Sequence, residues 1–249
     1  MRAALRKIKP ASGFGTALHI GLLLLLPIIV FVLVRLDFVQ LALSVVVLSK
    51  WRMFAVRPRF WPANIRANAV DLMVGLSIVL FMGHSGSLVV QFVWAALYAV
   101  WLILIKPGSS LAWTSGQAFI GQLVALMALY LTWAAAPIAA LTLMTGIICY
   151  LASRHFFDSF EEPYARLISY FWGYVGAAMA WVLSHWLLYY QGVALPTLLL
   201  TTIGYGLAGL YYLDHKDRLS KTMRRQFIFI MIAIVLVVLA FADWGNKVV

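Results

Sequence analysis

Cysteine, acidic residues and long polar segments are all scarce in this sequence. Cys149 is the single cysteine, so an intrachain disulfide and a redox-active thiol pair are excluded. Eight Asp and Glu residues stand against 19 Lys and Arg residues, which gives a formal net charge of +11. No polar stretch between the apolar runs exceeds about 20 residues, which leaves no room for a soluble domain.

Apolar residues dominate instead. They make up 64% of the chain, against about 45–50% in soluble domains, and the mean hydropathy is +0.96. The sequence therefore predicts a membrane protein. Its basic residues lie in short loops between apolar runs, which is typical of charges that set topology and contact anionic lipid headgroups. No basic soluble domain is present, so a nucleic-acid partner is not expected.

The apolar runs predict an all-α, polytopic transmembrane helical bundle of about nine spans, with a range of 8–10. Residues 1–249 are expected to form a single integral membrane domain. The chain must turn near Asp37, and the tight hairpin at 134–137 leaves open whether the fifth and sixth helices both span fully. The predicted helices cover residues 16–34, 38–56, 62–82, 88–105, 115–133, 137–153, 165–190, 193–213 and 226–243.

The distribution of positive charge predicts the orientation. Seventeen of the 19 Lys and Arg residues fall on one side of this topology, and the exceptions are Arg35 and Lys247. Cytoplasmic loops carry the Lys/Arg excess, so the N-terminus is predicted inside and the C-terminus outside, in a bacterial cytoplasmic membrane. The run 17–34 resembles a signal peptide but is too long and lacks a cleavage site, so it is predicted to be the first span.

Several functions of membrane proteins are disfavoured by what the spans lack. No Asp, Glu, Lys or Arg is expected in the middle of a span, which weighs against a proton-coupled pump. No lysine is placed to hold retinal, and the five histidines form no haem-binding pair, although His84 and His185 could meet at the outer side. The sequence identifies neither a cofactor nor a metal.

The first candidate site lies at the start of the third predicted helix. Three arginines and three side chains with oxygen ligands gather there: Arg57, Arg59, Arg66, Asn64, Asn68 and Asp71. The last three are spaced to share one helix face. Arginine suits phosphate, and the carboxylate and amide oxygens could hold Mg²⁺. The set could bind a lipid headgroup or an isoprenoid phosphate; alternatively it is a polar helix end with topology-setting arginines.

A second candidate cluster follows the sixth predicted helix and contains three of the eight acids. It consists of His155, Asp158, Glu161, Glu162 and Arg166. On a helix, His155, Asp158 and Glu162 would share a face and could bind a metal. Alternatively, the cluster is a solvated inner loop that balances nearby cations.

Two partial resemblances to enzyme families involve these clusters. The string Glu161-Glu162-x-x-x-Arg166 resembles the EExxxR motif of CAAX-type intramembrane proteases. The second motif of that family, Phe-x-x-x-His, has Trp181-x-x-x-His185 as its nearest counterpart. The third motif, a His followed four residues later by Asn or Asp, fails at His215, because Leu219 occupies the last position. Nine helices with polar groups after the second and sixth are similar in layout to UbiA-type prenyltransferases, although the repeated DxxxD spacing is absent. That likeness would imply binding of a Mg-diphosphate at the inner face.

Small and polar residues inside the predicted spans point to further roles. Ser169, Gly173 and Ala177 recur every four residues, as do Gly204 and Ala208, which favours close helix packing or a path for a substrate. A transporter would need polar groups near the bilayer midplane. The candidates are Gln40, Gln91, Gln117, Gln122 and Thr145.

These features together predict a transport or lipid-handling protein. The alternatives are an intramembrane enzyme acting on a lipid or isoprenoid phosphate at the inner face, and a structural subunit of a larger membrane complex. The expected partners are membrane lipids, with anionic headgroups at the inner face, and either a membrane-complex partner or a second copy of the chain.

The predicted orientation can be tested by cysteine labelling in a Cys149→Ala background. His84→Cys should react with an impermeant maleimide added from outside, because the turn at His84 is predicted to be external. Arg57→Cys, in the basic loop, should react only after the membrane is permeabilised. Labelling of the Arg57 position in intact cells would show that the predicted orientation is wrong.

Overall fold

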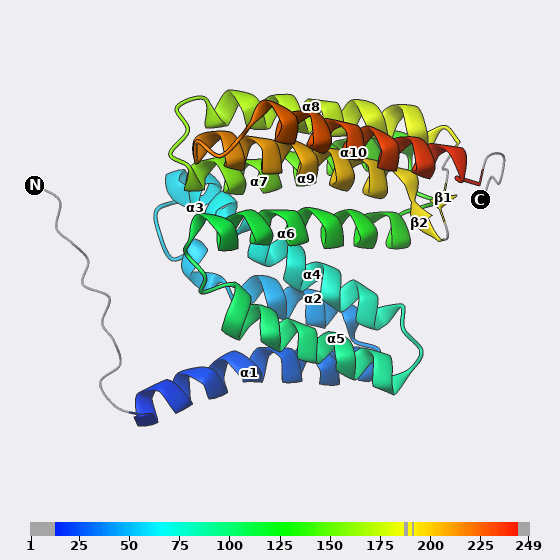
Figure 1. Ribbon diagram of the computed structural model, residues 1–249. Helices are drawn as coiled ribbons and strands as arrows, with labels where there is room; N and C mark the ends of the chain where they lie inside the picture. The colour runs from blue at the N-terminus through cyan, green and yellow to red at the C-terminus, as the bar shows by residue number, and fades with distance from the viewer. Residues whose placement is uncertain (1–12, 187–188, 191, 244–249) are drawn as a thin grey trace, which may run out of the picture.

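The computed structural model describes residues 13–186, 189–190 and 192–243, and it is built almost entirely from α-helices (Figure 1). The basic residues 2–9 and Lys247 lie outside the described residues. The α-helices of the described chain are α1 (Gly13–Arg35), α2 (Val39–Leu48), α3 (Trp61–Ala67), α4 (Ala69–Gly83), α5 (Leu88–Val100), α6 (Leu111–Thr132), α7 (Ile138–Ser159), α8 (Ala165–Ser184), α9 (Leu195–His215) and α10 (Lys221–Ala240).

Helix α6 lies in the middle of the bundle. On one side it packs against α4, which is accompanied by α1, α2 and α5; on the other it packs against α7 and α9 (Figure 1). Helices α8 and α10 lie outside α7 and α9 (Figure 1). The strands β1 (Tyr189–Tyr190) and β2 (Val193–Ala194) form an antiparallel hairpin between α8 and α9. The predicted seventh helix therefore ends at Ser184 rather than at residue 190.

The all-helical fold is confirmed, whereas the count of nine spans stays a prediction. In the part of the chain that the structure describes, five segments are long and apolar enough to cross a membrane, and α3 with α4 would make a sixth as a bent pair. Residues Ile20–Arg35 of α1 and the whole of α2 are apolar but shorter. Helix α9 is long enough but less apolar, because threonine, glycine and tyrosine interrupt its leucines. The five segments are Leu88–Ile105, Leu111–Thr132, Ile138–Ser159, Ala165–Ser184 and Lys221–Ala240.

The second and third predicted helices are both broken near their basic ends. Helix α2 stops at Leu48 and is followed by two 3₁₀ turns, η1 (Trp51–Met53) and η2 (Pro58–Phe60), so a helix to residue 56 was wrong. Asn68 separates α3 from α4, and the two segments meet at 67°. Pro58 begins η2 and removes one backbone donor, which is tolerated at a first helical position.

The outer surface of the bundle is as apolar as its interior. Only 6% of the most apolar window of α10 is buried, although that window has a mean hydropathy of 2.2. Phe229 of α10 and Phe171 of α8 are among the exposed large apolar side chains. A soluble monomer rarely exposes such continuous apolar surface, so the fold is that expected of an integral membrane protein.

The closest helix pair is α7 with α8, which pack through glycines. A Cβ on Gly173 would lie 3.0 Å from the carbonyl oxygen of Gly146, and one on Gly176 would lie 2.7 Å from Sγ of Cys149. Small residues let helix backbones approach closely where the surrounding lipid offers no hydrophobic drive. The stripe of Ser169, Gly173 and Ala177 therefore serves helix packing, one of its two predicted roles.

Gly173→Ala should destabilise the α7–α8 pair by about 1–3 kcal/mol, because the methyl group presses on a backbone carbonyl. Gly21→Ala in α1 is the matched control, since an added Cβ there meets nothing within 4 Å. Both variants gain the same helix propensity, so their difference in unfolding free energy in detergent isolates the contact. Equal unfolding free energies for the Gly173→Ala and Gly21→Ala variants would show that a methyl group at Gly173 costs the α7–α8 contact nothing.

Candidate functional site

Asp71 lies at the bend between α3 and α4 and is almost fully buried. It is in the first turn of α4, and 8% of its surface is exposed. The expectation that no ionisable residue lies in the middle of a span stays a prediction, since Asp71 is at the start of α4, beside the bend. The spacing of Asn64, Asn68 and Asp71 predicted that they share one face of a continuous helix. The break at Asn68 means that they do not.

Two lysines from distant segments contact the same oxygen of Asp71. Lys50 follows α2, and Lys106 follows the π-helical turn η3 (Trp101–Ile105); the Lys106 ammonium is 2.6 Å from Oδ2 of Asp71. The indole N–H of Trp101 donates to Oδ1 at 2.9 Å. The Lys106 backbone N–H donates to the Trp101 carbonyl. This π-type bond brings the Lys106 and Trp101 side chains to the side of the turn that contacts Asp71. We call these four residues the Asp71 cluster.

The Asp71 cluster holds one more positive than negative charge. Burial lowers the pKa of Lys50, the charge of Lys106 acts in the same direction, and attraction to Asp71 opposes both. Burial also disfavours the charged form of Lys106, but attraction to Asp71 outweighs it, so the pKa of Lys106 is raised. The better-exposed lysine therefore keeps its proton more firmly than the buried one.

The other residues of the first candidate set do not assemble around Asp71. The Asn64 amide donates to the Met53 carbonyl, and the Asn68 amide donates to the Asn64 carbonyl, so both stabilise the chain around the bend. Arg57 and Arg59 are exposed and Arg66 is half-buried. The Arg59 guanidinium lies 4.6 Å from the ring centre of Phe60. Phosphate binding by these arginines stays a prediction, without Asp71 as its metal ligand.

Residues of the second candidate cluster each contact a different partner. Arg154 pairs with Asp158 at 3.0 Å, and the Tyr211 hydroxyl donates to Glu162. Helix α7 ends at Ser159, so Glu161 and Glu162 lie beyond the helix that carries His155 and Asp158. Arg166 is exposed, with its guanidinium 5.7 Å from the ring centre of Tyr170. Among the described residues, no three His, Cys, Asp or Glu side chains are placed to share a metal ion.

Gln117 of α6 connects the two candidate regions. Its amide N–H groups donate to the carbonyls of Ile105 at 2.7 Å and Gly108 at 3.0 Å, which fixes the turn that carries Lys106. Its carbonyl oxygen lies 3.1 Å from Nε2 of His155. A chain of polar contacts thus runs from the Asp71 cluster through α6 to α7.

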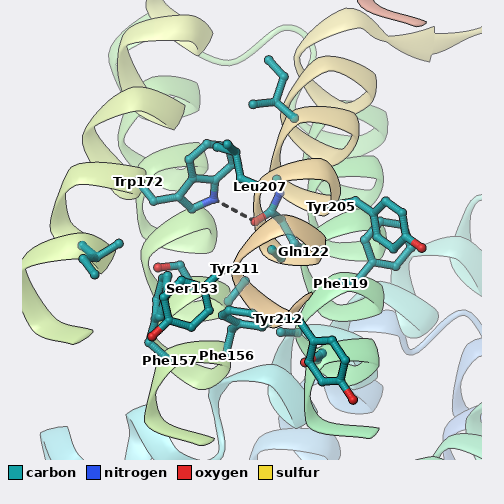
Figure 2. Close-up of a pocket in the computed structure, with 18 of the residues that line it drawn as sticks. Phe119, Gln122, Ser153, Phe156, Phe157, Trp172, Tyr205, Leu207, Tyr211 and Tyr212 are labelled. Carbon is teal, nitrogen blue, oxygen red and sulfur yellow. Dashed lines mark hydrogen bonds between the residues drawn. The ribbon is translucent and has the colours of Figure 1, made fainter. Parts of the chain in front are cut away.

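A cavity of about 810 Å³ lies between α6, α7, α8, α9 and α10. Its walls are mainly aromatic and aliphatic, and none of the described residues that line it is Asp, Glu, Lys, Arg or His. Figure 2 shows Ser153, Phe156, Phe157 and Tyr211 gathered in one part of the cavity, with Phe119 and Tyr205 in another. The cavity occupies the halves of the helices that end at the basic loops, next to the second candidate cluster.

One hydrogen-bonded pair and one unpaired hydroxyl lie in the cavity wall. The Trp172 indole N–H donates to the Gln122 carbonyl oxygen at 3.1 Å (Figure 2), and the Gln122 amide donates to the Leu200 carbonyl at 3.2 Å. These contacts join α6, α8 and α9. The Ser153 hydroxyl is buried and has no hydrogen-bond partner among the described residues. An unsatisfied buried hydroxyl costs about 1–3 kcal/mol.

The cavity opens laterally toward the surface that would face lipid. Phe171 of α8 and Tyr205 of α9 line it and are 66% and 61% exposed. Helices α8 and α9 pack loosely against each other compared with α7 and α8. The Tyr205 ring stacks at a tilt on Phe119, 5.1 Å between centres. A chain-shaped apolar molecule could therefore reach the cavity from the side.

Sequence reasoning named some residues of this cavity without placing them together. Gly204 and Ala208 line it, and Gly204 also packs closely, since a Cβ on it would lie 3.0 Å from the Trp172 ring; a substrate path along them stays a prediction. Gln122 was one of five polar groups proposed for a transporter. The aromatic residues of the wall gave no signal, because an aromatic side chain in a membrane helix is equally typical of a lipid-facing surface.

The CAAX-protease resemblance does not correspond to a single site. Glu162 precedes α8 and His185 follows it, and a helix of that length separates its ends by about 30 Å. The His185 ring nitrogen Nδ1 instead lies 2.6 Å from the Trp181 carbonyl of the same helix. No protein-family model, curated protein or solved structure matches this chain.

Asp71→Asn should destabilise the fold by about 3–5 kcal/mol, because two lysines would lose their shared counter-charge in a buried position. Lys106→Gln should cost much less, since Lys50 still neutralises Asp71 and the repulsion between the lysines is removed. Unfolding in detergent measures both. Equal stability losses for the two variants would contradict the charge balance described for this cluster.

Proposed function

We propose that this protein is an integral protein of the bacterial cytoplasmic membrane, embedded through nine helical segments, that takes up a lipid from the bilayer into the α6–α10 cavity. Its role is then lipid handling: binding a chain-shaped membrane lipid, for transfer or for presentation to a partner. The observation that carries the proposal is a charge-free cavity of about 810 Å³ with exposed apolar residues at its rim.

The size and lining of the cavity support a lipid ligand. Ligand sites of proteins are commonly about 300–1,000 Å³, mostly apolar, with a few placed polar groups. Gln122, Ser153 and Trp172 are such groups in this wall. Because lipid tails are as apolar as the helix surface, transfer from bilayer to cavity costs little, and selectivity has to come from shape and polar contacts.

Transport of a polar solute receives less support. Gln91 donates to the Met82 and Ser85 carbonyls, and Thr145 hydrogen-bonds Tyr130, so neither is left to line a polar path. Gln117 fixes the Lys106 turn, and Gln40 is exposed. Of the five polar candidates, Gln122 is the one that lines the cavity.

The basic loop before α4 supports contact with lipid headgroups at the inner face. Trp51 and Trp61 are exposed beside Arg57 and Arg59, and the Trp61 indole donates to the Val56 carbonyl. Exposed tryptophan and arginine together are typical of an element at the membrane interface. This loop would anchor the protein on anionic headgroups, while the cavity holds the lipid chain.

Ala208→Trp should block the cavity, because Ala208 lines it and an indole would occupy space now open to a ligand. Overfilling costs about 1–3 kcal/mol, so the lipid retained should fall at least about fivefold. Native mass spectrometry of the purified protein gives the amount of bound lipid.

Leu143→Trp is the matched control, since Leu143 is 63% exposed on α7 and does not line the cavity. It should retain lipid like the original chain. The same lipid content in the Ala208 and Leu143 variants would contradict lipid binding in the cavity. A role as structural subunit would instead show as loss of a co-purifying membrane partner.

A further inference from the structure

We infer that the lipid bound in the α6–α10 cavity carries an uncharged hydroxyl or carbonyl, which is held inside the cavity by Ser153 and Gln122. This inference rests on the proposed lipid-binding function and adds the chemical class of the ligand. Three observations carry it: the unpaired Ser153 hydroxyl, the free N–H of Gln122, and the lack of charge in the wall.

Of the two helical serines in the described chain whose buried hydroxyl has no partner, Ser153 and Ser184, Ser153 is the one that lines the cavity. Ser44, Ser77 and Ser169 each donate to the carbonyl four residues earlier, the usual partner of a helical serine. Ser153 is 9% exposed, lines the cavity (Figure 2), and makes no such bond in the described chain. Its hydroxyl can therefore both donate to and accept from a ligand.

Gln122, which also lines the cavity, has an amide N–H group that none of the described contacts uses. Its amide nitrogen carries two N–H groups, and the described contacts use one, to the Leu200 carbonyl. Its oxygen already accepts from Trp172, which fixes which end of the amide is the nitrogen. A Cβ at Gly204 would lie 3.3 Å from that nitrogen, so the glycine leaves the nitrogen accessible from the cavity.

The two groups lie at similar depth. Helices α6 and α7 are antiparallel neighbours, joined by Tyr130 to Thr145 and by Gln117 to His155. Following these contacts along the pair places Ser153 level with residues 119–122 of α6, within about one helical turn of Gln122. Oxygen functions of a ligand at this level of the cavity can thus bond with Ser153 and accept from Gln122.

The absence of charge in the wall selects against a phosphate in the cavity. None of the described lining residues is a cation, and a buried anion without a partner is strongly disfavoured. Next to the second candidate cluster, Arg154 is paired with Asp158, and Arg166 of the cluster is exposed; neither lines the cavity. An alcohol or a ketone satisfies the available groups without introducing charge.

The test compares three twenty-carbon probes in nanodiscs that contain the full chain. Geranylgeraniol, geranylgeranyl phosphate and the hydrocarbon phytane are added at equal mole fraction in the bilayer, and native mass spectrometry measures how much of each is retained. The alcohol should be retained about fivefold or more over the hydrocarbon, the value of one net hydrogen bond, and also over the phosphate.

Ser153→Ala should reduce retention of the alcohol about fivefold and leave that of the hydrocarbon unchanged. Ser153→Thr keeps the hydroxyl and should restore binding. Ser169→Ala is the matched control, because Ser169 donates to the Ala165 carbonyl and lies outside the cavity wall.

The possible outcomes distinguish failure of this inference from failure of the proposed lipid-binding function. Equal retention of all three probes, or strongest retention of the phosphate, would overturn the inference and leave lipid binding standing. Loss of alcohol binding in the Ser169 variant to the same degree as in the Ser153 variant would also overturn it. Retention of none of the probes would remove the proposed function itself.

Discussion

One carboxylate, that of Asp71, joins parts of the bundle that would otherwise have few specific contacts. Lys50 comes from the end of α2, and Lys106 and Trp101 come from the turn after α5. Gln117 then fixes the Lys106 turn to α6 and contacts His155 of α7. Because apolar helices in a bilayer gain nothing by burying more apolar surface, directional contacts of this kind fix which helices are neighbours. The position of the cavity depends on α6, and so on this chain of contacts.

The second half of the bundle shows how a cavity arises between helices of similar composition. Glycines let α7 and α8 come into backbone contact, as at Gly173 and Gly146. Between α8 and α9 the contact is looser, and the large residues Trp172 and Tyr211 line the cavity there together with Gly204 and Ala208. Gly204 packs closely against the Trp172 ring, because a Cβ on it would lie 3.0 Å from that ring.

The sequence predicted the helices well and their interruptions poorly. Apolar runs located every helix from α4 to α10 to within about seven residues at either end, and the turn at Asp37 is present, with a positive φ of 62°. The break at Asn68 and the hairpin after Ser184 were missed, because apolar periodicity continues through both. The spacing of Asp71 was visible, but its lysine partners come from segments 21 and 35 residues away, which no local pattern connects. The cavity was equally hidden, since it depends on distances between helices.

The lengths of the helices have a consequence for the surrounding bilayer. Helices α6 and α7 each have 22 residues and are about 33 Å long, whereas α4 has 15 residues and is about 22 Å long. A hydrocarbon layer is about 30 Å thick, so α6 and α7 match it and α4 alone falls short of it. Helix α4 would therefore cross such a layer only together with α3, and the 67° bend between them shortens their combined reach. In a bilayer this would favour local thinning next to the bend at Asn68, at a cost of fractions of a kcal/mol per Å.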